Sequence, residues 1–159
     1  MENIIGIDDS RLITDILNRS FMTVAMQFNF TKENAPHFVA FIGPDVIENN
    51  LKNGLKMYGY SLNDTIIGCA GYSHHKDSAY FIERLAVLPE HRHMGVGRKL
   101  MEFAEGKIKE HGGTMAEVHV VDINTILIEW YKKLGYKEIR VDEIKSLPFN
   151  SCVMNKELL

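Results

Sequence analysis

The chain has 159 residues, of which 45% are hydrophobic, and its formal net charge at pH 7 is −3. This length and apolar content are typical of one globular domain with a core of its own, so we expect residues 1–159 to form a single domain. The mildly negative charge argues against a general nucleic-acid-binding protein, which would carry a surplus of basic residues.

The start of the chain and its cysteines argue against export, membrane insertion and metal binding. Residues 1–3 lack the basic-then-apolar order of a signal peptide, and no apolar run approaches the ~20 residues that span a bilayer. Cys69 and Cys152 are isolated, which supports neither a disulfide framework nor a zinc site. His91 and His93 have a metal-like spacing but no third ligand. We expect a cytoplasmic protein without membrane association or bound metal.

The N-terminal third is predicted to be mostly helical. Asp8 to Ser10 offers a cap for a helix whose apolar residues recur at helical spacing. Thr31 can cap a second helical stretch, and Gly43-Pro44 separates that stretch from a third. The expected elements are a strand at 4–7, a helix from 10 to about 27, a helical stretch at 31–42 and a helix at 44–54.

From residue 55 the apolar pattern changes to strand periodicity. Asn63-Asp64 is a two-residue turn signal that predicts an antiparallel hairpin, and residues 74–77 are expected to form a polar turn. The expected strands are 55–62, 65–73, 79–88, 114–121, 136–144 and 149–155, with helices at 94–111 and 122–134. The strand, helix, strand order across 79–121 implies a parallel crossover. The fold class is α+β, with one mixed antiparallel and parallel sheet of about seven strands flanked by about four helices.

The turn from Arg92 to Gly97 is the most informative part of the chain. Its glycines, Gly95 and Gly97, remove side chains where the backbone must approach a ligand or adopt a positive φ. Successive amide N–H groups can then point into one concavity, and the helix that follows adds a partial positive charge. Arg92 and Arg98 offer cationic partners for phosphate oxygens. The turn therefore predicts a cradle for a phosphate-bearing ligand.

Two familiar phosphate-binding motifs do not fit this turn. A P-loop requires Lys-Ser/Thr after the second glycine, and a dinucleotide fingerprint requires a third glycine where Leu100 stands. The two glycines alone are a common pattern, but here they belong to a longer motif. Leu85-Ala86-Val87-x-Pro89-Glu90 precedes Arg92-x-x-Gly95-x-Gly97, which makes the whole string more specific. This string resembles the acyl-coenzyme A signature of the GNAT superfamily of N-acetyltransferases, and the resemblance extends from residue 55 to the end.

The resemblance implies where coenzyme A would bind. In GNAT folds the pantetheine arm lies like an added strand in the split between two parallel strands, which implies backbone contacts from residues 85–87. Asn124 suits a helix N-cap, and the resemblance adds a hydrogen bond to pantetheine. The implied coenzyme-binding residues are Leu85, Ala86, Val87, Arg92, His93, Met94, Gly95, Val96, Gly97, Arg98, Asn124 and Tyr131.

Tyr131 is the candidate general acid. It lies in the segment Trp130 to Tyr136, which is similar to the family's Tyr-x-x-x-Gly-aromatic pattern. In that pattern the tyrosine protonates the departing thiolate. A half-buried core tyrosine is the alternative reading of the same residue.

Glu83 is the candidate general base. It interrupts an apolar strand, where an unpaired buried charge is costly. Its side chain should point to the same face of the sheet as that of Leu85, unless a β-bulge intervenes. A base is required because a protonated alkylamine, with a pKa near ~10.4, cannot attack a thioester. An ion pair with Arg84 or another basic residue is an equally good explanation of Glu83, and Glu117, His119 or a water chain could act as the base instead.

The leading hypothesis is an N-acetyltransferase that transfers an acetyl group from acetyl-coenzyme A to a primary amine by direct attack in a ternary complex. No acyl-enzyme on a cysteine is expected. The alternative is a non-catalytic acyl-coenzyme A sensor, which would need the cradle but neither Glu83 nor Tyr131. The expected partners are a small-molecule or peptide amine and no nucleic acid, with a homodimer as the default assembly. The acceptor pocket, whose chemistry stays open, has four aromatic candidates, although aromatic residues in such numbers ordinarily serve packing: Phe28, Phe30, Tyr58 and Tyr72.

Overall fold

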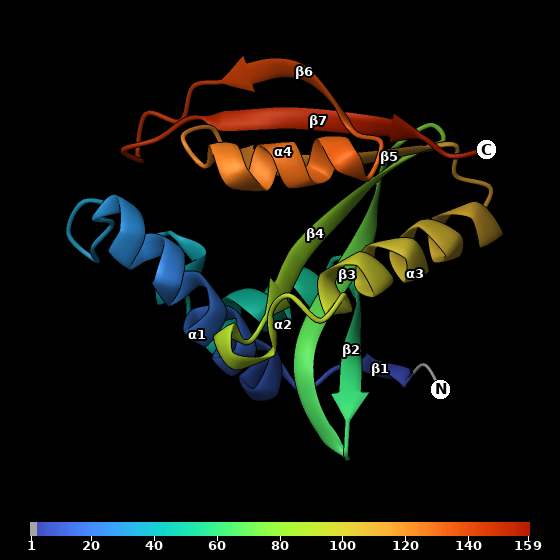
Figure 1. Ribbon diagram of the computed structural model, residues 1–159, viewed down its shortest axis with the longest axis horizontal. Helices are drawn as coiled ribbons and strands as arrows, with labels where there is room; N and C mark the ends of the chain where they lie inside the picture. Colours follow the sequence, from blue (N-terminus) through green and yellow to red (C-terminus); the bar gives the residue numbers. More distant parts are fainter. Residues whose placement is uncertain (1–2) are drawn as a thin grey trace.

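Seven strands join into one mixed sheet in the computed structural model, which describes residues 3–159 (Figure 1). The strands are β1 (Ile4–Ile7), β2 (Lys56–Leu62), β3 (Thr65–Lys76), β4 (Ala79–Val87), β5 (Met115–Val121), β6 (Lys137–Asp142) and β7 (Ser151–Glu157). Their order across the sheet is β1-β2-β3-β4-β5-β7-β6. Neighbouring strands pair antiparallel except β4 and β5, which are parallel, so the predicted mixed sheet and crossover are confirmed.

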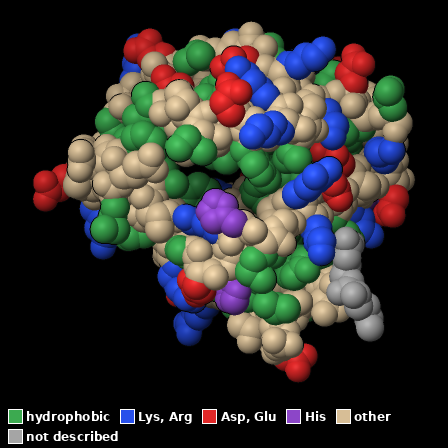
Figure 2. Space-filling model, in the orientation of Figure 1, with side chains coloured by type: hydrophobic (Ala, Val, Ile, Leu, Met, Phe, Trp, Pro, Cys, Tyr) green, Lys and Arg blue, Asp and Glu red, His purple; other side chains and the backbone are tan. Residues whose placement is uncertain are grey.

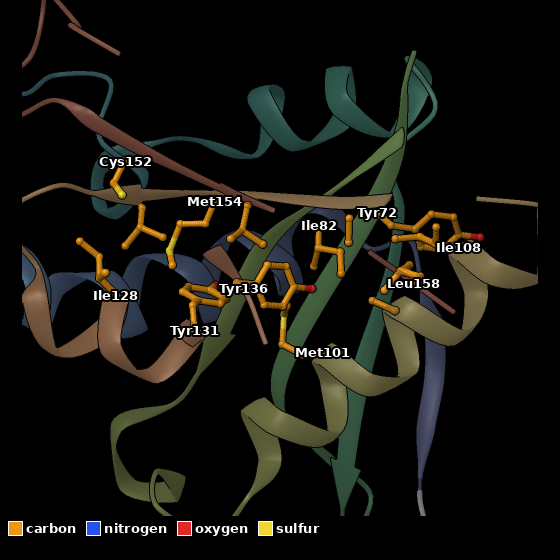
Figure 3. Close-up of a cluster of buried hydrophobic side chains, with 14 residues drawn as sticks. Tyr72, Ile82, Met101, Ile108, Ile128, Tyr131, Tyr136, Cys152, Met154 and Leu158 are labelled. Carbon is orange, nitrogen blue, oxygen red and sulfur yellow. The ribbon is translucent and has the colours of Figure 1, made fainter. Parts of the chain in front are cut away.

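Four α-helices cover the two faces of this sheet. They are α1 (Ser10–Phe28), α2 (Pro44–Lys52), α3 (Val96–Glu110) and α4 (Thr125–Lys133), with short 3-10 helices at Val39–Phe41 and Pro89–His91. Helices α1 and α2 bury Ile13, Leu17 and Ile47 against one face of the sheet. Helices α3 and α4 bury Ile108 and Ile128 against the other, in the cluster that Figure 3 shows. Within residues 3–159, none of the helices is long and apolar enough to cross a lipid bilayer.

Two local predictions are confirmed by the backbone. Asp9 caps α1, because its Oδ1 accepts hydrogen bonds from the amides of Arg11 (3.0 Å) and Leu12 (3.2 Å). Asn63 and Asp64 have φ angles of 50° and 65°. A two-residue hairpin turn of type I′ requires positive φ at both positions, so the predicted β2–β3 hairpin follows from this pair.

Two other predictions were wrong. Residues 31–42 form turns and the short 3-10 helix instead of an α-helix. Thr31 and Asn34 bond to each other locally, with Asn34 N donating to Thr31 Oγ1 (3.1 Å) and Thr31 N to Asn34 Oδ1 (2.8 Å). Such side-chain to backbone bonds compete with helix formation. Residues 74–76 belong to β3 instead of a turn, because His74 pairs with Tyr80 across the ladder.

Candidate functional site

The sheet splits between β4 and β5. Their parallel pairing covers only residues 79–81 opposite residues 115–117, although both strands continue well beyond, to Val87 and Val121. Figure 1 shows β4 running obliquely away from β5. From Ile82 onward, the backbone groups of β4 that face β5 therefore lack a strand partner. These groups can donate and accept hydrogen bonds to a ligand that lies in the split as an extended chain.

A β-bulge in β4 changes the face of the sheet to which the Glu83 side chain points. Cys69 pairs with Ala86 and Gly71 with Glu83, so two residues of β4 stand opposite one residue of β3. Arg84, inside the bulge, has a φ of 58°, a left-handed conformation that is uncommon for a residue other than glycine. Leu85 consequently faces α3, whereas Glu83 faces the side of α1. The bulge that the sequence left open as an exception is thus present, and Glu83 does not share a face with Leu85.

The turn before α3 presents a row of unpaired amides. His93 and Gly95 have positive φ angles of 64° and 81°, and α3 begins at Val96 without a side-chain cap. Among residues 3–159, no backbone or side-chain acceptor bonds to the amide N–H groups of residues 93–98. A helix N-terminus leaves such donors free and carries a partial positive charge. The turn thus has the geometry of an anion-binding site.

The two glycines of the turn differ in their backbone conformation. Gly95 adopts the left-handed conformation, which a side chain would strain. Gly97 is already helical, and a Cβ atom there would lie 3.4 Å from Cζ2 of Trp130. A side chain at residue 97 would therefore make an ordinary van der Waals contact with α4. Arg98, on the exposed side of α3, pairs with Glu102 at 3.0 Å.

Most hydrogen-bonding capacity of Arg92 is used within the protein. Its Nε donates to the carbonyl oxygen of Val87 (3.2 Å), and its terminal nitrogens donate to Thr23 Oγ1 (3.0 Å) and the Ser20 carbonyl oxygen (2.8 Å). Burial lowers the pKa of Arg92, but a guanidinium remains charged at neutral pH. Arg92 thus ties the turn to β4 and α1. The sequence pattern suggested a phosphate ligand and did not reveal this positioning role.

A cavity of about 570 Å³ joins the turn to the split in the sheet. All the predicted coenzyme-binding residues except Met94 and Tyr131 line it, together with Phe21, Val24 and Gln27 of α1 and Leu127 and Trp130 of α4. Figure 2 shows this hollow with hydrophobic side chains on its rim. The cavity therefore brings the unpaired amides and the free edge of β4 into one site.

Asn124 contributes to this cavity and also caps α4. Its Oδ1 accepts a hydrogen bond from the amide of Leu127 at 3.3 Å, as expected for an N-cap. Its side-chain nitrogen donates to no acceptor among residues 3–159. The expected N-cap is therefore confirmed, and the side-chain nitrogen can still donate to a ligand.

Tyr131 lies behind the wall of the cavity. Its side chain is 6% exposed and belongs to the buried cluster in Figure 3, where its ring is 5.0 Å from Trp130 and 5.7 Å from Tyr136. Its hydroxyl makes no hydrogen bond to residues 3–159, and burial raises its pKa above the ordinary value. The phenol therefore stays protonated at neutral and moderately alkaline pH, so it can act as a proton donor but not as a base.

A second cavity of about 450 Å³ meets the first along β4. Residues 81–84 line the second cavity, residues 85–87 line the first, and Phe21 borders both. The second cavity is also lined by His119 and by the aromatic residues Phe38, Phe81 and Phe149. None of the aromatic residues suggested for an acceptor pocket lines it: Phe28 and Phe30 pack in the cluster beneath, and Tyr58 and Tyr72 pack near α3. These four residues therefore have the packing role that the sequence offered as the alternative.

Glu83 is a half-buried carboxylate in the second cavity. Its Oε2 accepts a hydrogen bond from Ser73 Oγ at 2.9 Å. Within residues 3–159 Glu83 forms no ion pair, since the neighbouring Arg84 guanidinium donates to Asn50 Oδ1 on α2 (3.0 Å). The ion pair proposed from the sequence for Glu83 and Arg84 is therefore not formed. One carboxylate oxygen of Glu83 is left without a donor from the described chain.

The other candidate bases and the cysteines are placed differently. Glu117 Oε2 lies 2.8 Å from His119 Nε2, so these two side chains bond to each other on β5, and only His119 lines the second cavity. Cys69 and Cys152 line neither cavity. Burial raises the pKa of Cys69 to about 12 and that of Cys152 to about 11, which makes both thiols poor nucleophiles at neutral pH.

Comparison with known proteins identifies the family. A model of the acetyltransferase (GNAT) family matches residues 14–136. An uncharacterized N-acetyltransferase from Chlorobaculum tepidum is 30% identical over 106 residues, which are 67% of this chain. The chain spans 65% of that relative's own length.

Solved structures show the same fold. The PaiA N-acetyltransferase from Thermoplasma acidophilum, in complex with coenzyme A, superposes over 99% of each chain with a TM-score of 0.79 and 19% identity. The ribosomal-protein-S18-alanine N-acetyltransferase from Escherichia coli gives a TM-score of 0.76 and 17% identity over 99% of this chain and 94% of its own. Both neighbours are alike in fold, and the family match extends over well more than half of the sequence. The chain belongs to the GNAT acetyltransferase family.

Proposed function

We propose that the protein is an acetyl-coenzyme A dependent N-acetyltransferase that acetylates a primary amine in a ternary complex. The observation that carries this proposal is the row of unpaired amides at residues 93–98, which opens into the same cavity as the free edge of β4. Coenzyme A combines a diphosphate with an extended amide-containing arm. A cradle of N–H groups next to an unpaired strand edge is complementary to both parts.

In this proposal the diphosphate accepts hydrogen bonds from the amides of residues 93–98, and Arg98 adds charge at the rim. The pantetheine arm follows residues 85–87 toward the split, with the Asn124 side chain as a further donor. One backbone amide of residues 85–87 polarises the thioester carbonyl and stabilises the oxyanion that develops on attack. The acetyl group then lies where the two cavities meet.

The amine enters from the second cavity. Its nitrogen attacks the thioester carbonyl carbon, a C–N bond forms, and the C–S bond of the tetrahedral intermediate breaks. Glu83 accepts the proton that the nitrogen loses, and Tyr131 donates a proton to the departing thiolate. Glu83 fits the role of base because it is half-buried, free of an ion pair and located on the stretch of β4 next to the thioester position.

The test is release of free thiol from acetyl-coenzyme A with a panel of amines, together with calorimetric titration of coenzyme A. We expect coenzyme A to bind and thiol release to require an amine, with a linear onset because no acyl-enzyme accumulates. Tight coenzyme A binding without turnover on any amine would instead favour the sensor function. A burst of thiol release before amine is added would contradict direct transfer.

A further inference from the structure

The lining of the second cavity indicates which kind of amine the protein accepts. This inference rests on the proposed function. The cavity meets the coenzyme cavity along consecutive residues of β4, so whatever occupies it would lie next to the thioester. Its volume of about 450 Å³ is within the range of sites for small organic ligands. The side chains that line it therefore select the acceptor amine.

One wall of the second cavity is a layer of packed aromatic rings. Phe21 from α1 packs edge-on against Phe38 with ring centroids 6.0 Å apart, and Phe38 packs against Phe149 from the segment before β7 at 5.7 Å. These three rings come from separate parts of the chain and are held by their mutual contacts. A rigid aromatic layer favours an apolar, planar group on the ligand, through burial and through edge or offset stacking.

Another wall is formed by Phe81 on β4. Its ring stacks on His75 at 4.3 Å and meets His119 edge-on at 5.6 Å. Leu147 and Ile144, from the segment between β6 and β7, add apolar surface. The cavity is thus apolar on several sides, and its polar lining residues are His37, Glu83, Arg84, His119 and Ser151.

The charged groups narrow the choice further. Glu83 is the single carboxylate among the residues of the described chain that line this cavity. A polyamine needs several anionic partners for its ammonium groups, and only one is present. A free amino acid needs a cation for its carboxylate. Arg84 lines the cavity, but one of its terminal nitrogens donates to Asn50 Oδ1 on α2, and its Nε, which has no hydrogen-bond partner among residues 3–159, is buried. The charges therefore suit a ligand with one amino group and no carboxylate.

We infer that the acceptor is a primary monoamine that carries an aromatic ring, of the arylalkylamine class. The amino group would lie beside Glu83 and the thioester, and the ring would pack on the layer of Phe21, Phe38 and Phe149. Polyamines, free amino acids and small polar amines lack either the ring or the matching charge.

The experiment compares kcat/KM for 2-phenylethylamine, ethanolamine and spermidine at one pH, in the unmodified protein and in two variants. We expect 2-phenylethylamine to exceed both others by at least roughly tenfold, the discrimination that one buried apolar group supplies. Phe149→Ala should lower the preference for 2-phenylethylamine by about tenfold with little change in coenzyme A affinity. Phe41→Ala is the matched control, because Phe41 contacts Phe38 yet lies outside the cavity. This variant should keep the same preference for 2-phenylethylamine as the unmodified protein.

The outcomes separate this inference from the proposed function. Turnover of spermidine or ethanolamine at least as efficient as that of 2-phenylethylamine would overturn the acceptor class but leave the acetyltransferase function standing. If no amine is acetylated, binding of 2-phenylethylamine to the coenzyme-loaded protein is measured by calorimetry. Binding that Phe149→Ala abolishes would support the aromatic site and contradict the enzyme, whereas absence of binding would overturn both. If Phe41→Ala reduced the selectivity for 2-phenylethylamine as much as Phe149→Ala does, the assignment of the aromatic ring to this cavity would also be overturned.

Discussion

Replacing Tyr131 by phenylalanine should lower kcat by about 10²-fold to 10³-fold, the range expected when a general acid is lost. Coenzyme A should bind nearly as before, because phenylalanine retains the aromatic ring and removes only the hydroxyl. Burial raises the pKa of Tyr131, so the hydroxyl holds its proton at the alkaline pH values where amines lose theirs. Single-turnover kinetics with acetyl-coenzyme A, combined with calorimetry of coenzyme A, measures the two quantities separately.

Tyr136→Phe is the matched control for this variant. Tyr136 belongs to the same buried cluster, but its hydroxyl donates to Glu105 Oε2 at 2.7 Å, and Lys156 Nζ donates to the other oxygen at 3.0 Å. Loss of the Tyr136 hydroxyl should lower the free energy of unfolding by about 1–3 kcal/mol with little effect on kcat. Tyr131→Phe should leave the free energy of unfolding nearly unchanged. Full activity in Tyr131→Phe would assign Tyr131 to the core alone.

Replacing Glu83 by glutamine should lower kcat/KM at pH 7 by about 10²-fold to 10⁴-fold, the usual contribution of a general base. Glutamine preserves the size of the side chain and can still accept the hydrogen bond from Ser73, so the cavity should keep its shape. Without a base, the reaction depends on the small fraction of amine that is already deprotonated in solution. Alkylamines have pKa values near ~10.4, so the deficit of the variant should shrink as the pH rises toward that value.

His119→Gln distinguishes Glu83 from the other candidate base in the second cavity. If Glu83 is the base, kcat/KM of His119→Gln should stay within about threefold of the unmodified protein, and its pH profile should keep its shape. A large loss in His119→Gln together with a small loss in Glu83→Gln would transfer the role to the pair of His119 and Glu117, which lie 2.8 Å apart. Profiles of kcat/KM against pH for both variants decide between the two assignments.

Local sequence rules predicted the parts of the fold and site that depend on backbone conformation. Asn63-Asp64 specified the hairpin because both residues tolerate positive φ, and Gly95 specified the turn for the same reason. Apolar periodicity located every strand of the sheet, because alternation and helical spacing survive in half-buried elements. Many of the residues that line the first cavity lie within residues 85–98, one nearly continuous segment next to a strand end, which is why a local pattern could indicate them.

The second cavity is formed by contacts between distant segments, which local sequence rules did not predict. The bulge at Arg84 changes which face Glu83 occupies, and no feature of an Ile-Glu-Arg-Leu run indicates a left-handed residue. Phe21, Phe38 and Phe149 meet only because α1, the turns after it and the segment before β7 fold onto the same edge. Arg92 was expected to bind a phosphate group. In the structure, three of its donors bond instead to β4 and α1.

The binding of the coenzyme diphosphate by the amides of residues 93–98 can be measured directly from backbone amide chemical shifts in ¹⁵N-labelled protein. Titration with coenzyme A should move the amides of residues 93–98 and those of residues 82–87. Titration with pantetheine, which lacks the diphosphate, should move only residues 82–87. If saturating coenzyme A leaves residues 93–98 unshifted, the turn does not hold the diphosphate, and the proposed site is wrong.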